Sequence, residues 1–229
     1  MLIAHLGDKI HHPENTLAAF EAAHGLGACA IATEVQFSKD GTPWCFCGAQ
    51  LPQPELGDQP LHKVRDRDLK ALPLCSFGQL TDWANRHRHL EWFVEVSTAT
   101  LQRLSTEKAI KSLKREILVN PDAFVLLTDD IRSLRLGRSL GFDQVALRAP
   151  NVARCLSAEV VTLAPDYLFI EQSAVDCQEL PPGPWQWVVQ EINTAQGAIH
   201  WHHRGAHHLL TGNLPLLMRS REASNVYGI

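Results

Sequence analysis

Residues 28–47 read ACAIATEVQFSKDGTPWCFC, and this stretch decides the fold. Residues 28–36 form an apolar, β-branched run that is typical of a buried strand, and residues 42–47 form a second run of this kind. The Asp-Gly pair at 40–41 between them is the signal for a two-residue β-hairpin turn. We therefore expect 42–47 to turn back antiparallel to the end of the first run and to lie outside any parallel sheet that the first run joins.

Helix signals alternate with strand candidates along the rest of the chain. Asn15 or Thr16 is expected to cap a helix that begins at the next apolar residues, and Ser76–Gln79 has the pattern of a capping box. Ser105 caps a further helix, and Gly141 ends another. Strands that alternate with helices indicate a parallel sheet.

The number of strands decides between a barrel and an open, doubly wound sheet. Nine strand candidates are found, at residues 2–5, 28–36, 42–47, 92–96, 123–128, 143–148, 166–171, 185–191 and 206–211. Removing the hairpin strand leaves eight, which predicts a TIM (β/α)8 barrel as a single domain over residues 1–229. No Gly-rich phosphate loop follows the first strand, which weakens the doubly wound alternative. Residues 48–64 are expected to form a loop excursion over one mouth of the barrel.

Composition excludes several classes of protein. With 45% hydrophobic and 20% charged residues, the chain has the balance of an ordinary globular domain. A net charge of -4 argues against a nucleic-acid partner. The sequence shows neither a membrane-spanning apolar run nor a signal peptide, and its six cysteines are too few for a disulfide scaffold, so we expect a cytoplasmic protein with reduced thiols.

Three blocks in the first part of the chain resemble the glycerophosphodiester phosphodiesterase family. Residues 3–7 (IAHLG), 13–20 (PENTLAAF) and 34–41 (EVQFSKDG) are similar to the family patterns I-A-H-R-G, P-E-N-T-L-A-A-F and D-V-Q-x-T-K-D-G, with the same five-residue gap between the first two blocks. Weaker similarity follows at 93–97 and 205–215. The resemblance implies a TIM barrel that hydrolyses glycerophosphodiesters to glycerol 3-phosphate and an alcohol with a divalent cation, Mg²⁺ or Ca²⁺.

The resemblance also implies which residues form the site. His5 corresponds to the first acid/base histidine, and Glu34 and Glu95 correspond to two of the three carboxylate metal ligands. The second acid/base histidine is replaced by Cys47. Catalytic roles are therefore expected for His5 and Cys47, and metal binding for Glu34 and Glu95.

Four further family positions hold residues that cannot do the family's chemistry. Leu6 stands in place of a phosphate-binding arginine, and Ala32 in place of the first carboxylate. Gly48 replaces an aspartate, and Ser97 replaces a lysine close to the phosphate. Charge balance and proton transfer are therefore expected to be impaired.

Spacing predicts that the retained residues meet at one mouth of the barrel. Active sites of TIM barrels lie at the carboxyl ends of the strands, and inward side chains recur with period two. A two-residue turn at 40–41 would place Cys47 directly opposite Glu34. Two alternatives stay open, since Lys or Arg partners could neutralise Glu34 and Glu95, and Cys47 could be a plain core thiol.

Three functions remain after this comparison. The favoured one is a member with little or no activity that serves as a ligand-binding or regulatory barrel for a small phosphodiester or polyol-like ligand. The second is a working metal-dependent phosphodiesterase, and the third is a changed chemistry or metal. For the third, the donor set of His5, Cys47, Glu34 and Glu95 suits Zn²⁺. The histidines of residues 200–208 are a less favoured metal tract, and the protein could also bind no metal.

Overall fold

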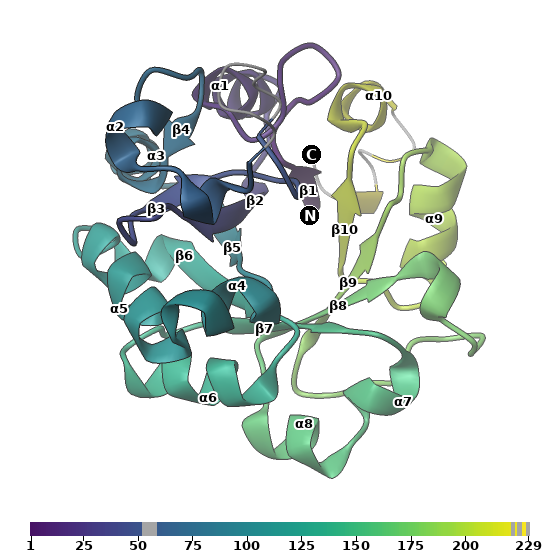
Figure 1. The fold of residues 1–229 in the computed structure, drawn as a ribbon. Coiled ribbons are helices and arrows are strands. Elements are labelled where there is room, and N and C mark those ends of the chain that lie inside the picture. The colour runs from purple at the N-terminus through teal and green to yellow at the C-terminus, as the bar shows by residue number, and fades with distance from the viewer. Residues whose placement is uncertain (52–58, 221–222, 224–225, 228–229) are drawn as a thin grey trace.

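A computed structural model of the chain describes residues 1–51, 59–220, 223 and 226–227. Eight parallel strands form a closed barrel, because the first strand pairs with both the second and the last. Figure 1 looks into this ring, with the helices arranged around its outside. The predicted TIM barrel is confirmed, and the order of its strands is β1 (Leu2–His5), β2 (Ala30–Phe37), β5 (Glu91–Glu95), β6 (Phe124–Thr128), β7 (Val145–Ala149), β8 (Tyr167–Glu171), β9 (Gln186–Gln190) and β10 (His208–Thr211).

The helices begin where the sequence signals placed them. Thr16 accepts a hydrogen bond from the Ala19 backbone at the start of the first helix, and Ser76 and Gln79 form the expected reciprocal capping box. The described helices are α1 (Leu17–Gly25), α2 (Asp66–Leu69), α3 (Phe77–Ala84), α4 (Thr98–Leu104), α5 (Thr106–Glu116), α6 (Ile131–Ser139), α7 (Val152–Cys155), α8 (Ala158–Leu163), α9 (Ala195–His203) and α10 (Leu214–Arg219), with 3-10 turns at η2 (Leu61–Lys63), η3 (Pro121–Ala123) and η4 (Gln172–Ala174).

The hairpin strand lies outside the barrel, as predicted, but in a different register. β3 (Pro43–Cys45) is antiparallel to β2, and Cys45 pairs with Val35 rather than with Gln36. The turn has three residues, because Ser38 pairs with Thr42, and Gly41 takes the positive φ of +84° that such a loop requires. A short strand that the sequence did not indicate, β4 (Cys75–Ser76), adds to the outer side of β3.

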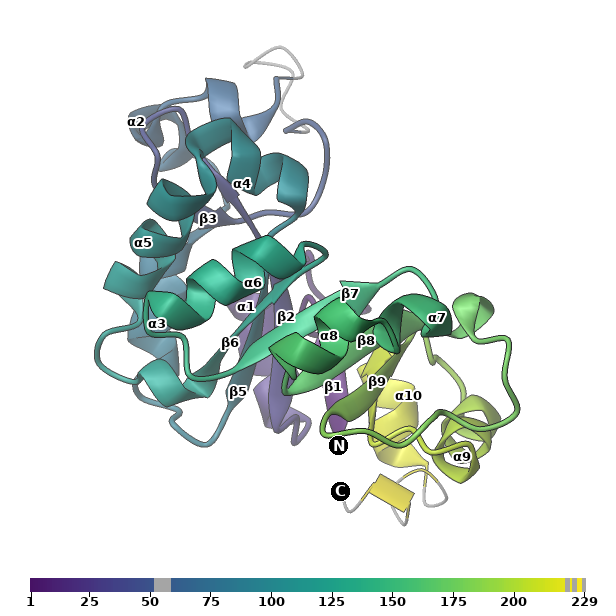
Figure 2. The same cartoon turned by 90° about the horizontal axis from the view of Figure 1, so that it is seen from below.

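Apolar side chains fill two separate layers of the barrel. Those inside the ring of strands include Ile3, Ala32, Phe93 and Ala146, and a larger layer lies between the strands and the helices. A third cluster packs Trp44 of β3 against apolar residues of the segment that follows this strand. Figure 2 shows β3 and α2 together at the end of the molecule opposite the N-terminus. Residues 52–58 of the predicted excursion lie outside the described part of the chain.

Candidate active site

Alternation along the strands turns three of the predicted residues into the barrel. Ile3, Ala32 and Phe93 belong to the interior cluster, and the side chains two residues later, His5, Glu34 and Glu95, are on the same face nearer the carboxyl ends of the strands. Glu34 and Glu95 are register partners on adjacent strands. The mouth of the barrel therefore holds the predicted residues where TIM barrels carry their active sites.

Strained backbone surrounds the same mouth. Leu6, Asn15 and Glu191 have φ values of 61°, 61° and 62°, a backbone conformation that residues other than glycine rarely adopt. The Asn15 side chain compensates with two bonds, one from the Thr33 hydroxyl at 2.6 Å and one to the Glu34 carbonyl oxygen at 2.8 Å. This side chain fastens the loop after β1 to the strand that carries Glu34.

Arg148 lies at the centre of the mouth, and we did not identify it from the sequence. Its guanidinium contacts the Glu95 carboxylate at 2.5 Å and also donates to Gln190 Oε1. The neutralising partner that the sequence left open for Glu95 is thus an arginine 53 residues away. The signal was present, because Arg148 is a charged residue in an apolar strand, two positions after the inward Ala146.

His5 is held uncharged by its surroundings. Its Nδ1 atom lies 3.4 Å from Lys9 Nζ and 3.6 Å from a Glu191 carboxylate oxygen. Burial, followed by the positive charges of Lys9 and Arg148, lowers the pKa of His5 to about 4. At neutral pH the ring is therefore a weak base and carries no proton to donate as an imidazolium.

Cys47 contacts Glu34, although not as its pairing partner. The residue whose backbone amide bonds the Glu34 carbonyl oxygen is Phe46, at 2.9 Å, because the turn is one residue longer than expected. The Cys47 thiol donates to the Glu34 carboxylate, and burial together with that negative charge raises the pKa of Cys47 to about 12. Burial also raises the pKa of Glu34. Without a cation beside it, the sulfur is thus a protonated donor near neutral pH.

The four substituted positions are occupied by residues with structural roles. Leu6 is 2% exposed, and Ala32 packs in the barrel interior. Gly48 has a φ of 134°, and its carbonyl oxygen accepts a bond from Gln36. The Ser97 hydroxyl caps α4 by accepting from the Thr100 amide. None of the four offers a charged group to a ligand.

The residues at this mouth do not suit a divalent cation. Glu95 is already paired with the guanidinium of Arg148, and Ala32 supplies no third carboxylate. Two buried nitrogen atoms beside them, Arg148 Nε and Gln190 Nε2, have no acceptor among the described residues. Unpaired donors call for an acceptor, whereas a cation would need further acceptors.

Metal clusters are also absent elsewhere in the described part of the chain. No group of three or more His, Cys, Asp or Glu side chains there is arranged to hold a metal ion. Within the histidine-rich segment, His207 Nδ1 accepts from the Trp187 amide and His208 Nδ1 contacts the Met1 amino group. These two rings therefore have separate structural partners.

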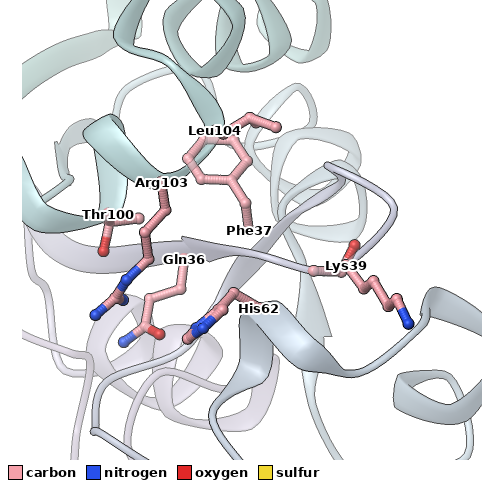
Figure 3. A pocket seen from close by; sticks show the side chains of 8 residues that line it. Gln36, Phe37, Lys39, His62, Thr100, Arg103 and Leu104 are labelled. Carbon is pink, nitrogen blue, oxygen red and sulfur yellow. The ribbon is translucent and has the colours of Figure 1, made fainter.

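A small pocket opens beside the mouth at the end of β2. Its volume is about 130 Å³, and it is lined by residues of β2, η2 and α4. Figure 3 shows the side chains of Gln36, His62 and Arg103 pointing toward one another, whereas Lys39 points away. His62 Nδ1 is buried there without a partner among the described residues. The pocket thus combines the cationic side chain of Arg103 with a buried histidine nitrogen that has no partner among the described residues.

Comparison with solved structures supports the same architecture. A phosphodiesterase from Oleispira antarctica in complex with the product sn-glycerol-3-phosphate is 18% identical, with a TM-score of 0.82 over 94% of each chain. A glycerophosphodiester phosphodiesterase from Thermotoga maritima is 15% identical, with a TM-score of 0.75 over 95% of this chain and 96% of that one. At these identities the similarity establishes the fold alone.

Sequence comparison establishes the family. A curated glycerophosphodiester phosphodiesterase from Caldanaerobacter subterraneus subsp. tengcongensis is 54% identical over 41 residues, which cover 18% of this chain and 17% of that relative. No described helix is long and apolar enough to cross a membrane. The profile of the Glycerophosphoryl diester phosphodiesterase family matches residues 5–146, more than half of the 229 residues, and the chain belongs to that family.

Proposed function

We propose that this chain is a glycerophosphodiester phosphodiesterase-family barrel that binds a small phosphodiester or polyol-like ligand and has little or no hydrolytic activity. The observation that carries the proposal is the contact of 2.5 Å between Arg148 and Glu95. Glu95 corresponds to a family metal ligand, and here it neutralises a resident arginine. In the same proposal the chain is a cytoplasmic, single-domain protein.

Proton transfer supports the same conclusion. Hydrolysis of a phosphodiester needs a base for the nucleophile and an acid for the leaving group. His5 has a pKa of about 4, and Cys47 has a pKa of about 12, so neither is matched to both tasks near pH 7. Each missing acid/base group typically lowers the rate by about 10²–10⁴-fold. What the mouth retains is a set of groups that bind and orient a ligand.

The second candidate function is a working metal-dependent phosphodiesterase. It is favoured by one observation, namely that His5, Glu34 and Glu95 all face the same mouth. In this alternative a Mg²⁺ or Ca²⁺ ion would have to displace Arg148 from Glu95. If the ion were Zn²⁺, it would have to displace the proton of the Cys47 thiol.

Turnover and metal content test the proposal. The protein as purified is analysed for bound metal, and release of glycerol 3-phosphate from glycerophosphocholine is assayed with Mg²⁺, Ca²⁺, Mn²⁺ or Zn²⁺ added. We expect less than one equivalent of metal and turnover close to the no-protein background. Ordinary enzymatic rates that disappear in His5→Ala would overturn the proposal and establish the working phosphodiesterase instead.

A further inference from the structure

Two buried cysteines face each other across the short antiparallel strands outside the barrel. Cys45 of β3 and Cys75 of β4 are register partners. Side chains of such partners lie on the same face of the sheet, and their Cα atoms are about 4.5–5.5 Å apart. This separation falls within the range of about 4.4–6.8 Å that a disulfide bond spans. The backbone therefore already holds the two residues at the distance that a cross-strand disulfide needs.

The two thiols also interact with each other. Cys45 is 1% exposed and Cys75 is 3% exposed, and both are free thiols. Burial, followed by the hydrogen bond with the Cys75 thiol, raises the pKa of Cys45. Thiols that merely fill a core are equally buried, but they need not be opposed in register and bonded to each other. The fold thus brings these two sulfur atoms together before any oxidation.

Cavities reach the pair from two sides. One cavity of about 390 Å³ is lined by Cys45, and another of about 350 Å³ is lined by Cys75. The two cavities adjoin, because Pro13, Pro73 and Leu74 line both of them. Each is many times larger than the share of about 30 Å³ that a water molecule has in the liquid, so a reagent little larger than water fits. Their proline and leucine side chains favour an uncharged reagent over a charged one.

We propose that Cys45 and Cys75 are a redox-active dithiol that hydrogen peroxide converts into a cross-strand disulfide. The Cys75 sulfur attacks first, because the raised pKa of Cys45 keeps that thiol protonated. It takes one peroxide oxygen to become a sulfenic acid, and the departing hydroxide accepts the Cys75 proton to form water. The Cys45 sulfur then forms the S–S bond and releases a second water. Two electrons pass from the sulfurs to the peroxide, so two thiols and one peroxide give one disulfide and two waters.

The disulfide fastens an element that few backbone contacts hold in place. β4 has only two residues, and two register pairs join it to β3. Its second residue, Ser76, caps α3. A bond between Cys45 and Cys75 closes the intervening chain into a loop, which restricts the unfolded state, and ties the start of α3 to β3. In a reducing compartment such a bond forms transiently and is reversed by thiol exchange.

Peptide mapping tests the inference on the whole wild-type chain. The reduced protein is treated with hydrogen peroxide, catalase removes the excess, and the remaining thiols are alkylated in denaturant before proteolysis without reductant. We expect the peptide of Cys45 joined to that of Cys75. Cys155 is the internal control and should stay alkylated, because it is equally buried but has no other cysteine paired with it in the described structure. A bond from Cys45 to Cys47, a bond between two chains, or the absence of any bond at Cys45 and Cys75 would overturn the inference.

Thermal unfolding supplies a second, independent readout. The melting temperature of the peroxide-treated wild type should exceed that of the reduced protein by roughly 5–10 °C, and a reductant should reverse the rise. Cys45→Ala and Cys75→Ala should lose the rise, whereas Cys155→Ala, which removes a buried thiol from α7, should keep it. A rise that persists in Cys75→Ala would place the oxidation elsewhere and contradict the proposal. The wild-type map decides by itself where a variant is too unstable to measure.

Discussion

His5 keeps the family's first acid/base position, yet its surroundings determine its charge. In the folded chain its pKa is about 4, whereas an unfolded chain would titrate near the ordinary value of 6.5. Between these two values the unfolded chain binds a proton that the folded chain does not. Stability therefore falls as the pH is lowered from about 6.5 toward 4.

We expect His5→Gln to make stability less dependent on pH in this window. In the wild type, the free energy of unfolding, measured by urea titration at several pH values, should decrease as the pH falls below 6.5. His5 should contribute at most about 1.4 kcal/mol per pH unit to this decrease, and His5→Gln should remove that contribution. His203→Gln is the control, because that ring is exposed at the end of α9. A pH profile that is identical in the wild type and His5→Gln would contradict the assignment.

Asn15 has a mechanical role that its position in a family motif does not reveal. It is 3% exposed, bonds Thr33 and the Glu34 carbonyl oxygen, and has a positive φ. Asn15→Gly allows the same backbone conformation but leaves the Thr33 hydroxyl and the Glu34 carbonyl oxygen without their hydrogen-bond partner. It should therefore lower the free energy of unfolding by about 2 kcal/mol or more. Asn15→Ala should cost about 1 kcal/mol beyond that, because alanine resists the left-handed conformation. Urea unfolding of both variants checks this order, which equal stabilities would contradict.

Single residues show where sequence reasoning stops. His5, Glu34 and Glu95 could be placed at the mouth because strand alternation is a local property. The partner of Glu95 was left open as a Lys or an Arg, although Arg148 is the only Lys or Arg on the barrel strands that the structure describes. The argument that selected the two glutamates, a charged residue on a buried strand, applies equally to Arg148 and would have found it.

Among the elements, the β2–β3 hairpin shows that the Asp-Gly pair specifies an antiparallel turn but not the length of its loop. The Asp-Gly pair predicted a turn and an antiparallel strand, and both are present. The predicted loop length of two residues was wrong, because an Asp-Gly pair also suits a three-residue loop in which the glycine takes the positive φ. One additional residue was enough to pair Phe46, not Cys47, with the Glu34 backbone.

Gly41→Ala should destabilise this hairpin through its backbone alone. A Cβ atom there would meet Leu104 at an ordinary distance of 3.6 Å, so the expected loss of about 1 kcal/mol comes from the φ of +84°. Gly25→Ala is the matched control, because Gly25 ends α1 without a positive φ and has nothing within 4 Å of its Cβ position. That variant should be neutral or more stable by up to about 1 kcal/mol. Thermal unfolding of the two variants separates the effect of the positive φ from the effect of adding a methyl group. Equal shifts of the melting temperature in the two variants would exclude the backbone effect.

For the molecule as a whole, the closed barrel could be predicted because each unit carries its own signals. Strand candidates, caps and helix stops are set by nearby residues, and their order leaves eight parallel strands once the hairpin is removed. Function depends instead on groups that come together from distant strands. The contact between Arg148 and Glu95 joins β7 to β5, and in the proposed function this ion pair takes the place of a metal ion at Glu95.

If the chain is inactive, as proposed, the arginine at the mouth also determines how the family's chemistry could be restored. Leu6→Arg, Ala32→Glu, Cys47→His and Ser97→Lys return four of the five substituted groups that carry charge or protons in the family, and Gly48 is left unchanged. With Arg148 in place, Glu95 stays paired and the guanidinium repels an incoming cation. We therefore expect the fourfold variant to bind Ca²⁺ weakly and to hydrolyse glycerophosphocholine slowly. Adding Arg148→Gln should release Glu95 beside the two restored or retained carboxylates and create an oxygen-rich site that suits a hard cation.

The measurement is thermal unfolding of the fivefold variant with Ca²⁺ or EDTA, because a ligand at 100 times its Kd stabilises a protein by about 2.7 kcal/mol. The control carries Arg135→Gln as its fifth change, because Arg135 is an exposed arginine on α6. Its melting temperature should not rise with Ca²⁺. Two costs accompany the restoration in both proteins, since Leu6 is buried and Ser97 caps α4, so their stabilities in EDTA are compared first. If the fourfold variant with its arginine intact were stabilised by Ca²⁺ as strongly as the fivefold one, Arg148 would not be the group that excludes the metal.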